Sequence, residues 1–392
     1  MRWYGWSQQG TKNLVAAALC AAAALVQGCG DDGDGGAGTS ANGGGGGGGG
    51  PSAGCVDARS HEALFSLADP GWCAVAVYRT DEELGYASLT WGRHGGPMLV
   101  RNDAQGAVEI VRLTPPDGAD GELAAARSTI DVDIPEGAFL GGQALDLPFF
   151  GWTAISWTSA FPDTLGELLL LDERAAAAAR YEVNGLFAAA AVEGRFLHTG
   201  LSPLGDPAAG PNGLYAADTC GAAGQDARLL PEGDSSCAAP AAVAAWGDNS
   251  GPVAADLRGN VFAVLPSSDG AQQARGFAAG AVARGAGPAE GDVLFTLPGV
   301  GTGLAAIAPE GNAPGLLVFQ PASIDPYEAL APVAVPYSAD GSRVQTDGEP
   351  RTFIELATPG TSVSLLTDEK NHLWIGGPLP DGGFLFAVAA RR

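Results

Sequence analysis

Short apolar runs separated by turn residues dominate the chain from residue 55 to residue 392. Six runs stand out: Ala74–Tyr78, Ala107–Leu113, Glu167–Leu171, Asn260–Leu265, Gly315–Phe319 and Phe384–Ala389. Glycine, proline, aspartate and asparagine lie between them, which is the pattern of strands joined by tight turns. An all-β domain is therefore predicted. The one helix-like stretch, Ala175–Ala179, could equally be a strand of small residues.

An acidic residue, followed by glycine or asparagine, precedes several apolar runs. The clearest copies are Asp163–Leu171, Asp256–Val264 and Asp368–Ile375, and looser ones are Asn212–Ala216, Glu310–Phe319 and His94–Val100. The acidic side chain can hydrogen-bond the turn backbone, and glycine or asparagine can take the positive φ of a hairpin turn. We expect Asp163, Asp256 and Asp368 to be equivalent turn formers around the rim of the domain.

The copies recur roughly every 45–70 residues, near the length of one propeller blade. The motif resembles bacterial β-propeller repeats, in which a D-x-x-G-N turn precedes an aromatic strand. The resemblance implies a six-bladed β-propeller, with seven blades as an alternative, and says nothing of function. A pair of β-sandwiches or two smaller β domains is the competing architecture.

Closure of such a fold requires the two ends of the domain to meet. We expect the final strand, Phe384–Ala389, to pair with an N-terminal strand such as Ala74–Tyr78, which would protect the sheet edges. Five tryptophans are interpreted as packing between blades rather than as a ligand platform: Trp91, Trp152, Trp157, Trp246 and Trp374.

Residues 1–28 have the features of a signal peptide. Arg2 and Lys12 supply positive charge before a thirteen-residue apolar run, Leu14–Val26, which is short for a membrane-spanning helix. The segment then ends in Val26-Gln27-Gly28-Cys29. This sequence resembles the lipobox of bacterial lipoproteins, which implies that Cys29 is lipidated and becomes a membrane anchor. A plain secretory signal with an incidental cysteine is the alternative.

Residues 29–54 form a predicted disordered linker. The segment contains Asp31, Asp32 and Asp34, followed by eight consecutive glycines, Gly43–Gly50, and cannot bury a core. An EF-hand counted from Asp31 would need glutamate at its twelfth position, where Asn42 stands. We therefore expect a flexible tether that holds the domain of residues 55–392 away from the lipid surface.

Four cysteines remain once Cys20 leaves with the signal peptide and Cys29 is lipidated. An even number in an exported protein favours two disulfides, with three possible pairings. We favour the two local ones, Cys55–Cys73 and Cys220–Cys237. No Cys-x-x-Cys occurs in the sequence, so zinc binding and thiol redox chemistry are poorly supported.

The formal net charge of −24 disfavours nucleic acid, and disfavours direct contact of the folded domain with an anionic membrane. The four histidines, His61, His94, His198 and His372, have no metal-ligand spacing and are interpreted as surface or turn residues. Gly247–Pro252 lacks the order of a serine-nucleophile loop and is interpreted as a turn. Gly299–Gly303 is not followed by a helix pattern, so a phosphate site is not expected.

These features favour a monomeric cell-envelope lipoprotein, at the outer membrane or cell surface, whose propeller binds a protein or glycan without catalysis. No catalytic residue, metal site or cofactor is predicted. A calcium-dependent propeller hydrolase or lyase acting on carbohydrate or a lactone is the first alternative, motivated by the surplus of carboxylates. A purely structural surface protein is the second.

Overall fold

The computed structural model describes residues 54–56, 64–82, 84, 89–92, 94–102, 107–130, 252–266, 272–283, 291–297, 300–324, 327–380 and 382–392, together with strand segments between residues 139 and 245. The predicted signal peptide, Cys29, and all of the predicted linker except Gly54 lie outside these residues, as do Cys220, Cys237, Asp163, Trp246 and His61. The chain divides into two units, residues 1–55 and 56–392. The second unit contains all of the described strands.

The described strands form six sheets of four strands or more and one two-stranded sheet. Each of the six is built mainly of antiparallel neighbours in chain order. The first two are β3 (Thr90–Gly92), β4 (Gly96–Asn102), β5 (Val108–Thr114), β7 (Ala124–Thr129), and β8 (Phe139–Leu147), β9 (Trp152–Thr158), β10 (Leu165–Leu171), β11 (Ala177–Asn184). The next two are β12 (Leu186–Val192), β13 (Arg195–Gly200), β14 (Gly213–Asp218), β15 (Ala241–Ala245), and β16 (Val253–Ala255), β17 (Val261–Pro266), β18 (Gln272–Phe277), β19 (Asp292–Leu297).

The last two sheets carry additional strands. One is β20 (Val300–Ile307), β21 (Gly315–Ile324), β23 (Val333–Ala339), β24 (Val344–Thr346), with β22 (Tyr327–Ala329) on β21 and β25 (Arg351–Thr352) on β23. The other is β27 (Ser364–Thr367), β28 (Leu373–Pro378), β29 (Phe384–Arg391), β2 (Trp72–Thr80), β6 (Asp120–Glu122). A short helix, α2 (Ala279–Ala283), follows β18.

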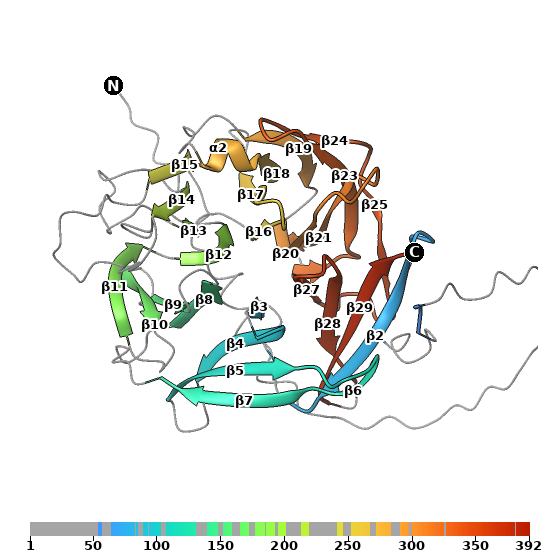
Figure 1. Ribbon diagram of the computed structural model, residues 1–392, viewed down its shortest axis with the longest axis horizontal. Coiled ribbons are helices and arrows are strands. Elements are labelled where there is room, and N and C mark those ends of the chain that lie inside the picture. The colour runs from blue at the N-terminus through green and yellow to red at the C-terminus, as the bar shows by residue number, and fades with distance from the viewer. Residues whose placement is uncertain are drawn as a thin grey trace, which may run out of the picture. The chain divides into compact units, whose positions relative to one another are not determined.

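The first strands of these six sheets contact one another in sequence order. β3 contacts β8, β8 contacts β12, β12 contacts β16, β16 contacts β20, β20 contacts β27, and β27 returns to β3 (Figure 1). This closed succession around a common centre, with each sheet running outward, makes the unit an all-β propeller. The prediction of a propeller is therefore confirmed. The number of such sheets within the described residues matches the favoured blade count, which itself stays a prediction.

The two ends of the domain meet in one sheet. β29 pairs antiparallel with β2, with Tyr78 opposite Phe386 and Thr80 opposite Phe384. The expected pairing of the last strand with an N-terminal strand is thus confirmed. A second N-terminal strand, β1 (Phe65–Leu67), pairs with β26 (Ile354–Leu356). The N-terminal segment is thereby joined to two neighbouring sheets.

Apolar side chains pack between adjacent sheets rather than into one central core. One cluster lies between the β16 and β20 sheets and includes Phe262, Leu317 and Tyr337. Another lies between the β27 and β3 sheets and includes Trp374 and Val111. Burial of these faces supplies most of the driving force for sheet packing. The third cluster, between the β20 and β27 sheets, also takes in residues beside and within β1 and β26, among them Leu64, Phe65, Phe353 and Ile354.

The structure differs from the expected equivalence of the three aspartate motifs, and it settles the conformation of part of Ala175–Ala179. Asp163 itself lies outside the described residues, but β10, the strand that follows it in the sequence, is the third strand counted outward from the centre of the ring. Asp256 and Asp368 precede second strands, β17 and β28, so the three motifs do not occupy equivalent places in their sheets. The D-x-x-G pattern identifies a hairpin but not which hairpin of a sheet it makes. The stretch Ala175–Ala179 enters β11 at Ala177 and is a strand from there.

Candidate functional site

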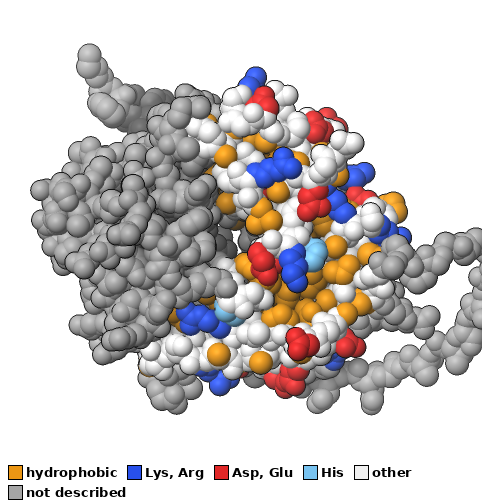
Figure 2. Space-filling view, in the orientation of Figure 1, with side chains coloured by type: hydrophobic (Ala, Val, Ile, Leu, Met, Phe, Trp, Pro, Cys, Tyr) orange, Lys and Arg blue, Asp and Glu red, His pale blue; other side chains and the backbone are white. Residues whose placement is uncertain are grey.

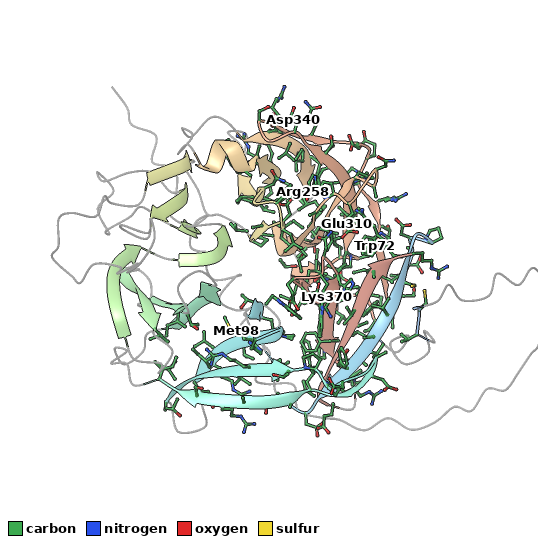
Figure 3. The ribbon with its side chains drawn as sticks, viewed as in Figure 1. Trp72, Met98, Arg258, Glu310, Asp340 and Lys370 are labelled. Carbon is green, nitrogen blue, oxygen red and sulfur yellow. The ribbon has the colours of Figure 1, made fainter. Side chains whose placement is uncertain are left out.

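Three hairpin turns, each joining the first strand of a sheet to its second, lie next to one another. We call Asp256–Asn260, Ala308–Gly315 and Asp368–His372 the turn row. The Arg258 guanidinium donates to the carbonyl oxygen of Pro309, and the Asn371 side-chain amide donates to Glu310 Oε1 at 2.9 Å. Figure 3 shows Arg258, Glu310 and Lys370 along this row. The turns therefore form one continuous surface on the face of the ring seen in Figure 3, and the expected position of the aspartates around the rim stays a prediction.

Asp256 is a buried turn former, 5% exposed. Its Oδ1 accepts hydrogen bonds from the amides of Arg258 and Asn260, both at 2.9 Å. Its Oδ2 accepts from Asn260 Nδ2 at 2.8 Å and from the hydroxyl of Tyr337 at 2.6 Å. Burial, reinforced by the Asp256 charge, raises the pKa of Tyr337 far above its usual value, so the hydroxyl stays a donor. Both carboxylate oxygens are committed to the protein.

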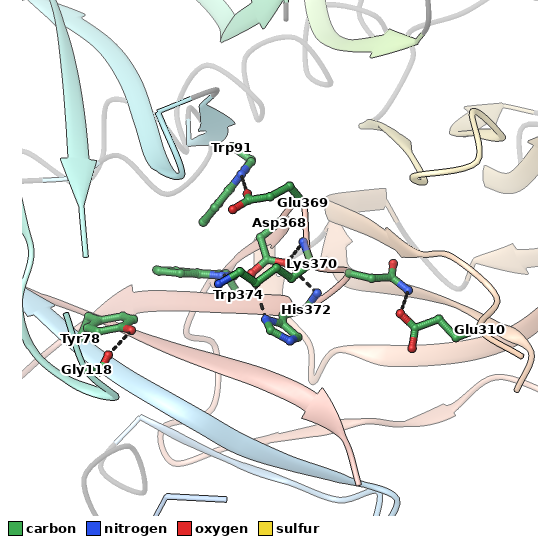
Figure 4. A network of polar contacts seen from close by, with 10 residues as sticks. Tyr78, Trp91, Gly118, Glu310, Asp368, Glu369, Lys370, His372 and Trp374 are labelled. Carbon is green, nitrogen blue, oxygen red and sulfur yellow. Dashed lines mark hydrogen bonds and ion pairs between the residues drawn. The ribbon is translucent and has the colours of Figure 1, made fainter. Parts of the chain in front are cut away.

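Asp368 repeats this arrangement in the next turn but one (Figure 4). Its Oδ1 accepts from the amides of Lys370 and His372 at 2.9 and 2.7 Å. Its Oδ2 lies 3.1 Å from His372 Nδ1 and accepts from Trp374 Nε1 at 3.0 Å. Burial opposes ionisation of Asp368, but the hydrogen bonds from His372 and Trp374 prevail and lower its pKa. The hydrogen bond to Asp368 in turn raises the pKa of His372.

The fourth residue of each turn has the backbone conformation that the sequence predicted. Gly259 and Asn371 have φ values of 81° and 65°. Asn371 also ties its turn to the neighbouring sheet, because its side chain accepts from the amide of Ala308 at 2.8 Å and donates to the same residue's carbonyl oxygen at 2.9 Å. In the other turn Asn260 accepts from the amide of Ala279 at 3.0 Å. The turns are thus fixed to each other as well as internally.

The side chains left exposed on the turn row are those at the turn tips. Leu257, at 53% exposure, and Arg258 occupy the second and third positions of one turn. Glu369 and Lys370 occupy the same positions of another, and Glu310 is exposed between them. Charged side chains of both signs accordingly gather near the centre of the face shown in Figure 2. The hydrogen-bonded turn fixes the backbone from which each of these side chains extends.

Trp91, in β3, closes the row where the first and last sheets meet. Its indole Nε1 donates to Glu369 Oε2 at 2.6 Å, and its ring packs on Trp374 with centroids 4.8 Å apart. Trp374 also stacks on Tyr78 at 5.4 Å. Trp91 and Trp374 therefore pack between sheets, as expected. The side chains of Trp152 and Trp157, in β9, are outside the description.

The other residues singled out by the sequence lie in a disulfide, in turns or in strands wherever the structure describes them. Cys55 and Cys73 are disulfide-bonded, in agreement with the favoured pairing. His94 lies in the turn between β3 and β4, with Nε2 3.2 Å from the carbonyl oxygen of Leu113, and His198 lies in β13. Gly301 and Gly303 are part of β20 rather than a phosphate loop. Of Gly247–Pro252 only Pro252 is described.

The described segments bear on metal binding and on membrane spanning. These contain no group of three or more His, Cys, Asp or Glu side chains that could hold a metal ion. No helix within them is both long and apolar enough to cross a membrane. The turn row is therefore a surface of exposed side chains above two aspartates, Asp256 and Asp368, whose carboxylate oxygens already accept hydrogen bonds from the protein.

Sequence reasoning found the turn aspartates and missed their partners. Tyr337 is 81 residues from Asp256, and Glu369 is 278 residues from Trp91. Neither partner carries a local signal, because each meets its aspartate or tryptophan only through the order of the sheets. The link from Asn371 to Ala308 was missed for the same reason.

Comparison with known proteins gives similarity of fold without a family. No protein-family model and no curated protein matches the chain. Among solved structures, it is similar to the PQQ-bound aldose sugar dehydrogenase of Streptomyces coelicolor, at 13% identity and a TM-score of 0.45, covering 83% of this chain and 98% of that one.

Two further structures resemble it to a similar degree. One is the soluble aldose sugar dehydrogenase of Escherichia coli, with 9% identity, a TM-score of 0.45 and coverage of 82% and 99%. The other is AofleA of Arthrobotrys oligospora, with 11% identity, a TM-score of 0.41 and coverage of 80% and 82%. Similarities of this extent assign neither a substrate nor an activity to this chain.

Proposed function

We propose that this protein is a lipid-anchored envelope protein whose propeller binds a protein or glycan without catalysis, and that the turn row is its contact surface. The observation that carries the proposal is the state of Asp256 and Asp368. Each accepts four hydrogen bonds from its own protein and is at most 5% exposed. Neither is available as a general base or metal ligand, whereas the side chains at the tips of the turns are exposed on a backbone that the aspartates fix.

Anchoring through Cys29 completes the proposal. A lipidated Cys29 followed by the glycine-rich linker would hold the propeller at the outer membrane or cell surface while leaving the turn row free to reach a partner. The charge of −24 makes nucleic acid a poor partner.

The anchor is tested by expressing the full chain in a bacterial host supplied with an alkyne analogue of palmitate. We expect the wild-type protein to carry the label and to partition into detergent, and the Cys29→Ser variant to do neither. Cys20→Ser is the matched control and should behave as wild type, because Cys20 leaves with the signal peptide. Label retained in Cys29→Ser would overturn the anchor.

The contact surface is tested by quantifying binding of the purified full chain to an array of glycans and envelope proteins from the producing organism. We expect the double variant Glu369→Ala/Lys370→Ala to lose at least tenfold in affinity for any partner that the wild type binds. Glu349→Ala, an exposed residue away from the turn row, is the control and should bind normally. Equal binding by the double variant would place the contact elsewhere, and turnover of a bound glycan would exclude a non-catalytic role.

A further inference from the structure

The outer strand of the first sheet, β7, is unusually exposed. It pairs with β5 on one side and ends the order of its sheet on the other (Figure 1). Five of its six residues are exposed, and the sixth, Ser128, is half-buried. Since successive side chains of a strand point to opposite faces, both faces of β7 as well as its outer edge are open.

Two backbone hydrogen bonds fix which amides of β7 point to that open edge. The amide of Ile130 donates to Val108 at the start of β5, at 2.8 Å, whereas the amide of Leu123 donates outward to Arg79 of β2, at 2.7 Å. Amides alternate in direction along an antiparallel strand. The amides of Ala124, Ala126 and Ser128 therefore face β5, and those of Ala125, Arg127 and Thr129 face outward, without a partner among the described residues.

In the neighbouring sheet, which contains β2, the edge is covered. The outer edge of β2 is covered by β6, which pairs with it in parallel from Val77 to Arg79. The hydroxyl of Tyr78 adds a hydrogen bond to the carbonyl oxygen of Gly118 at 2.8 Å. The connection from β5 to β7, which contains β6, thus covers the outer edge of β2 and leaves the outer edge of β7 uncovered. Bare edge strands are sites at which another strand can be added.

β7 is also held in place and easy to approach. Arg127 pairs with Glu82, which pairs with Arg101 at 3.0 Å, which in turn pairs with Glu109 of β5 at 2.8 Å. The other five side chains are Ala, Ser or Thr. An incoming strand would therefore meet a preorganised backbone without displacing large side chains, which lowers the cost of binding.

The charges around β7 indicate the kind of strand that fits. The connection before it carries Asp117, Asp120 and Glu122, all exposed, and no Lys or Arg between Pro115 and Glu122. Acidic side chains accordingly gather on the lower rim in Figure 2, near the position of β6 in Figure 1. Together with the chain's formal charge of −24, this favours a cationic partner.

We propose that β7 binds an extended basic peptide segment of a partner protein, which adds as a further antiparallel strand to the β3–β4–β5–β7 sheet. Main-chain hydrogen bonds to Ala125, Arg127 and Thr129 supply the affinity, and the acidic connection selects basic side chains. The site is separate from the turn row, so it stands or falls independently of the proposed function.

The test uses the purified full chain and fluorescein-labelled probe peptides, read by fluorescence anisotropy at low salt. The probes are a basic peptide of strand-forming residues, Lys-Thr-Val-Lys-Thr-Val, the same peptide with glutamate for lysine, and the basic peptide with proline for each valine. We expect only the first to bind. Equal binding of the proline peptide would indicate charge adsorption alone and overturn the proposal, as would no binding of the first.

Two proline variants of the protein separate strand addition from folding. Ala125→Pro removes an outward amide and should reduce affinity for the basic peptide at least tenfold while leaving the melting temperature close to wild type, because edge strands tolerate proline on the solvent side. Ala126→Pro removes an amide that faces β5 and should lower the melting temperature. Full binding by Ala125→Pro would contradict the proposal.

Discussion

At the scale of single residues, the same chemistry recurs in two turns built from different residues. Asn260 Nδ2 in one turn and His372 Nδ1 in the other reach the second carboxylate oxygen of the aspartate four positions earlier. Each aspartate then receives one bond from an aromatic side chain, either the Tyr337 hydroxyl of a neighbouring sheet or the Trp374 indole of the strand that follows the turn. Each aspartate thus connects its own turn to an aromatic side chain of the clusters packed between sheets.

Asp368→Ala should destabilise the protein by about 3 kcal/mol, because it leaves the buried indole N–H of Trp374 and two turn amides without their acceptor. Chemical denaturation of the full chain measures this. Asp340→Ala is the control, since Asp340 makes a similar turn to the amides of Ser342 and Arg343 but lies at the surface. A loss no larger than that of Asp340→Ala would show that Asp368 is not the structural residue described.

The pair of His372 and Asp368 should make stability depend on pH. The pKa of His372 is raised in the folded protein, so its contribution is complete below about pH 6.5, the value of the unfolded chain, and is lost as pH rises through the folded value. The lowered pKa of Asp368 adds stability above about pH 3.9 that is lost as pH falls.

We therefore expect the unfolding free energy of the wild type to fall between pH 6 and pH 8 by more than that of His372→Gln, which keeps a donor for Asp368 but does not titrate. Denaturant unfolding at each pH provides the comparison. Parallel pH profiles for the two proteins would contradict the assignment.

At the scale of elements, the sequence was most informative about single strands, turn conformations and the closure of the ring. Apolar runs at Ala74–Tyr78 and Phe384–Ala389 predicted both strands and their pairing across the closure. The positive φ at Gly259 and Asn371 followed from turn chemistry. The helix α2 was not predicted, because Ala279–Ala283 is too short and small to show a helical period. The position of a hairpin within its sheet, wrong for Asp163, depends on long-range pairing that no local pattern encodes.

The disulfide between Cys55 and Cys73 should stabilise the first unit of secondary structure after the linker. It closes a short loop that contains β1, next to the hydrogen bond from the Val56 amide to Ala74. Replacing both cysteines by alanine should cost about 3 kcal/mol in the chain-entropy model. Thermal unfolding of the variant against the wild type tests this, and peptide mapping without reduction tests the predicted Cys220–Cys237 bond. No change in melting temperature would mean that the loop is already ordered without the disulfide.

At the scale of the whole molecule, the propeller explains why an acidic chain has no cluster of metal-binding carboxylates among its described residues. In the described segments, the buried aspartates Asp256 and Asp368 serve turns, and the clusters packed between sheets are mainly apolar. What the sequence could not supply is the set of contacts between turns of different sheets, such as Trp91 with Glu369, because these arise only when the ring closes. The candidate site was therefore visible as separate turns but not as a continuous surface.

We propose that the turn carboxylates, Asp256 and Asp368, serve the fold rather than a metal-dependent reaction. Thermal unfolding of the full chain in calcium and in chelator tests it most directly, with magnesium as the control for ionic strength. A metal bound only by the folded state raises stability as its concentration rises. We expect the same melting temperature in all three conditions. A melting temperature that climbs steadily with calcium, and not with magnesium, would contradict it and favour a calcium-dependent enzyme.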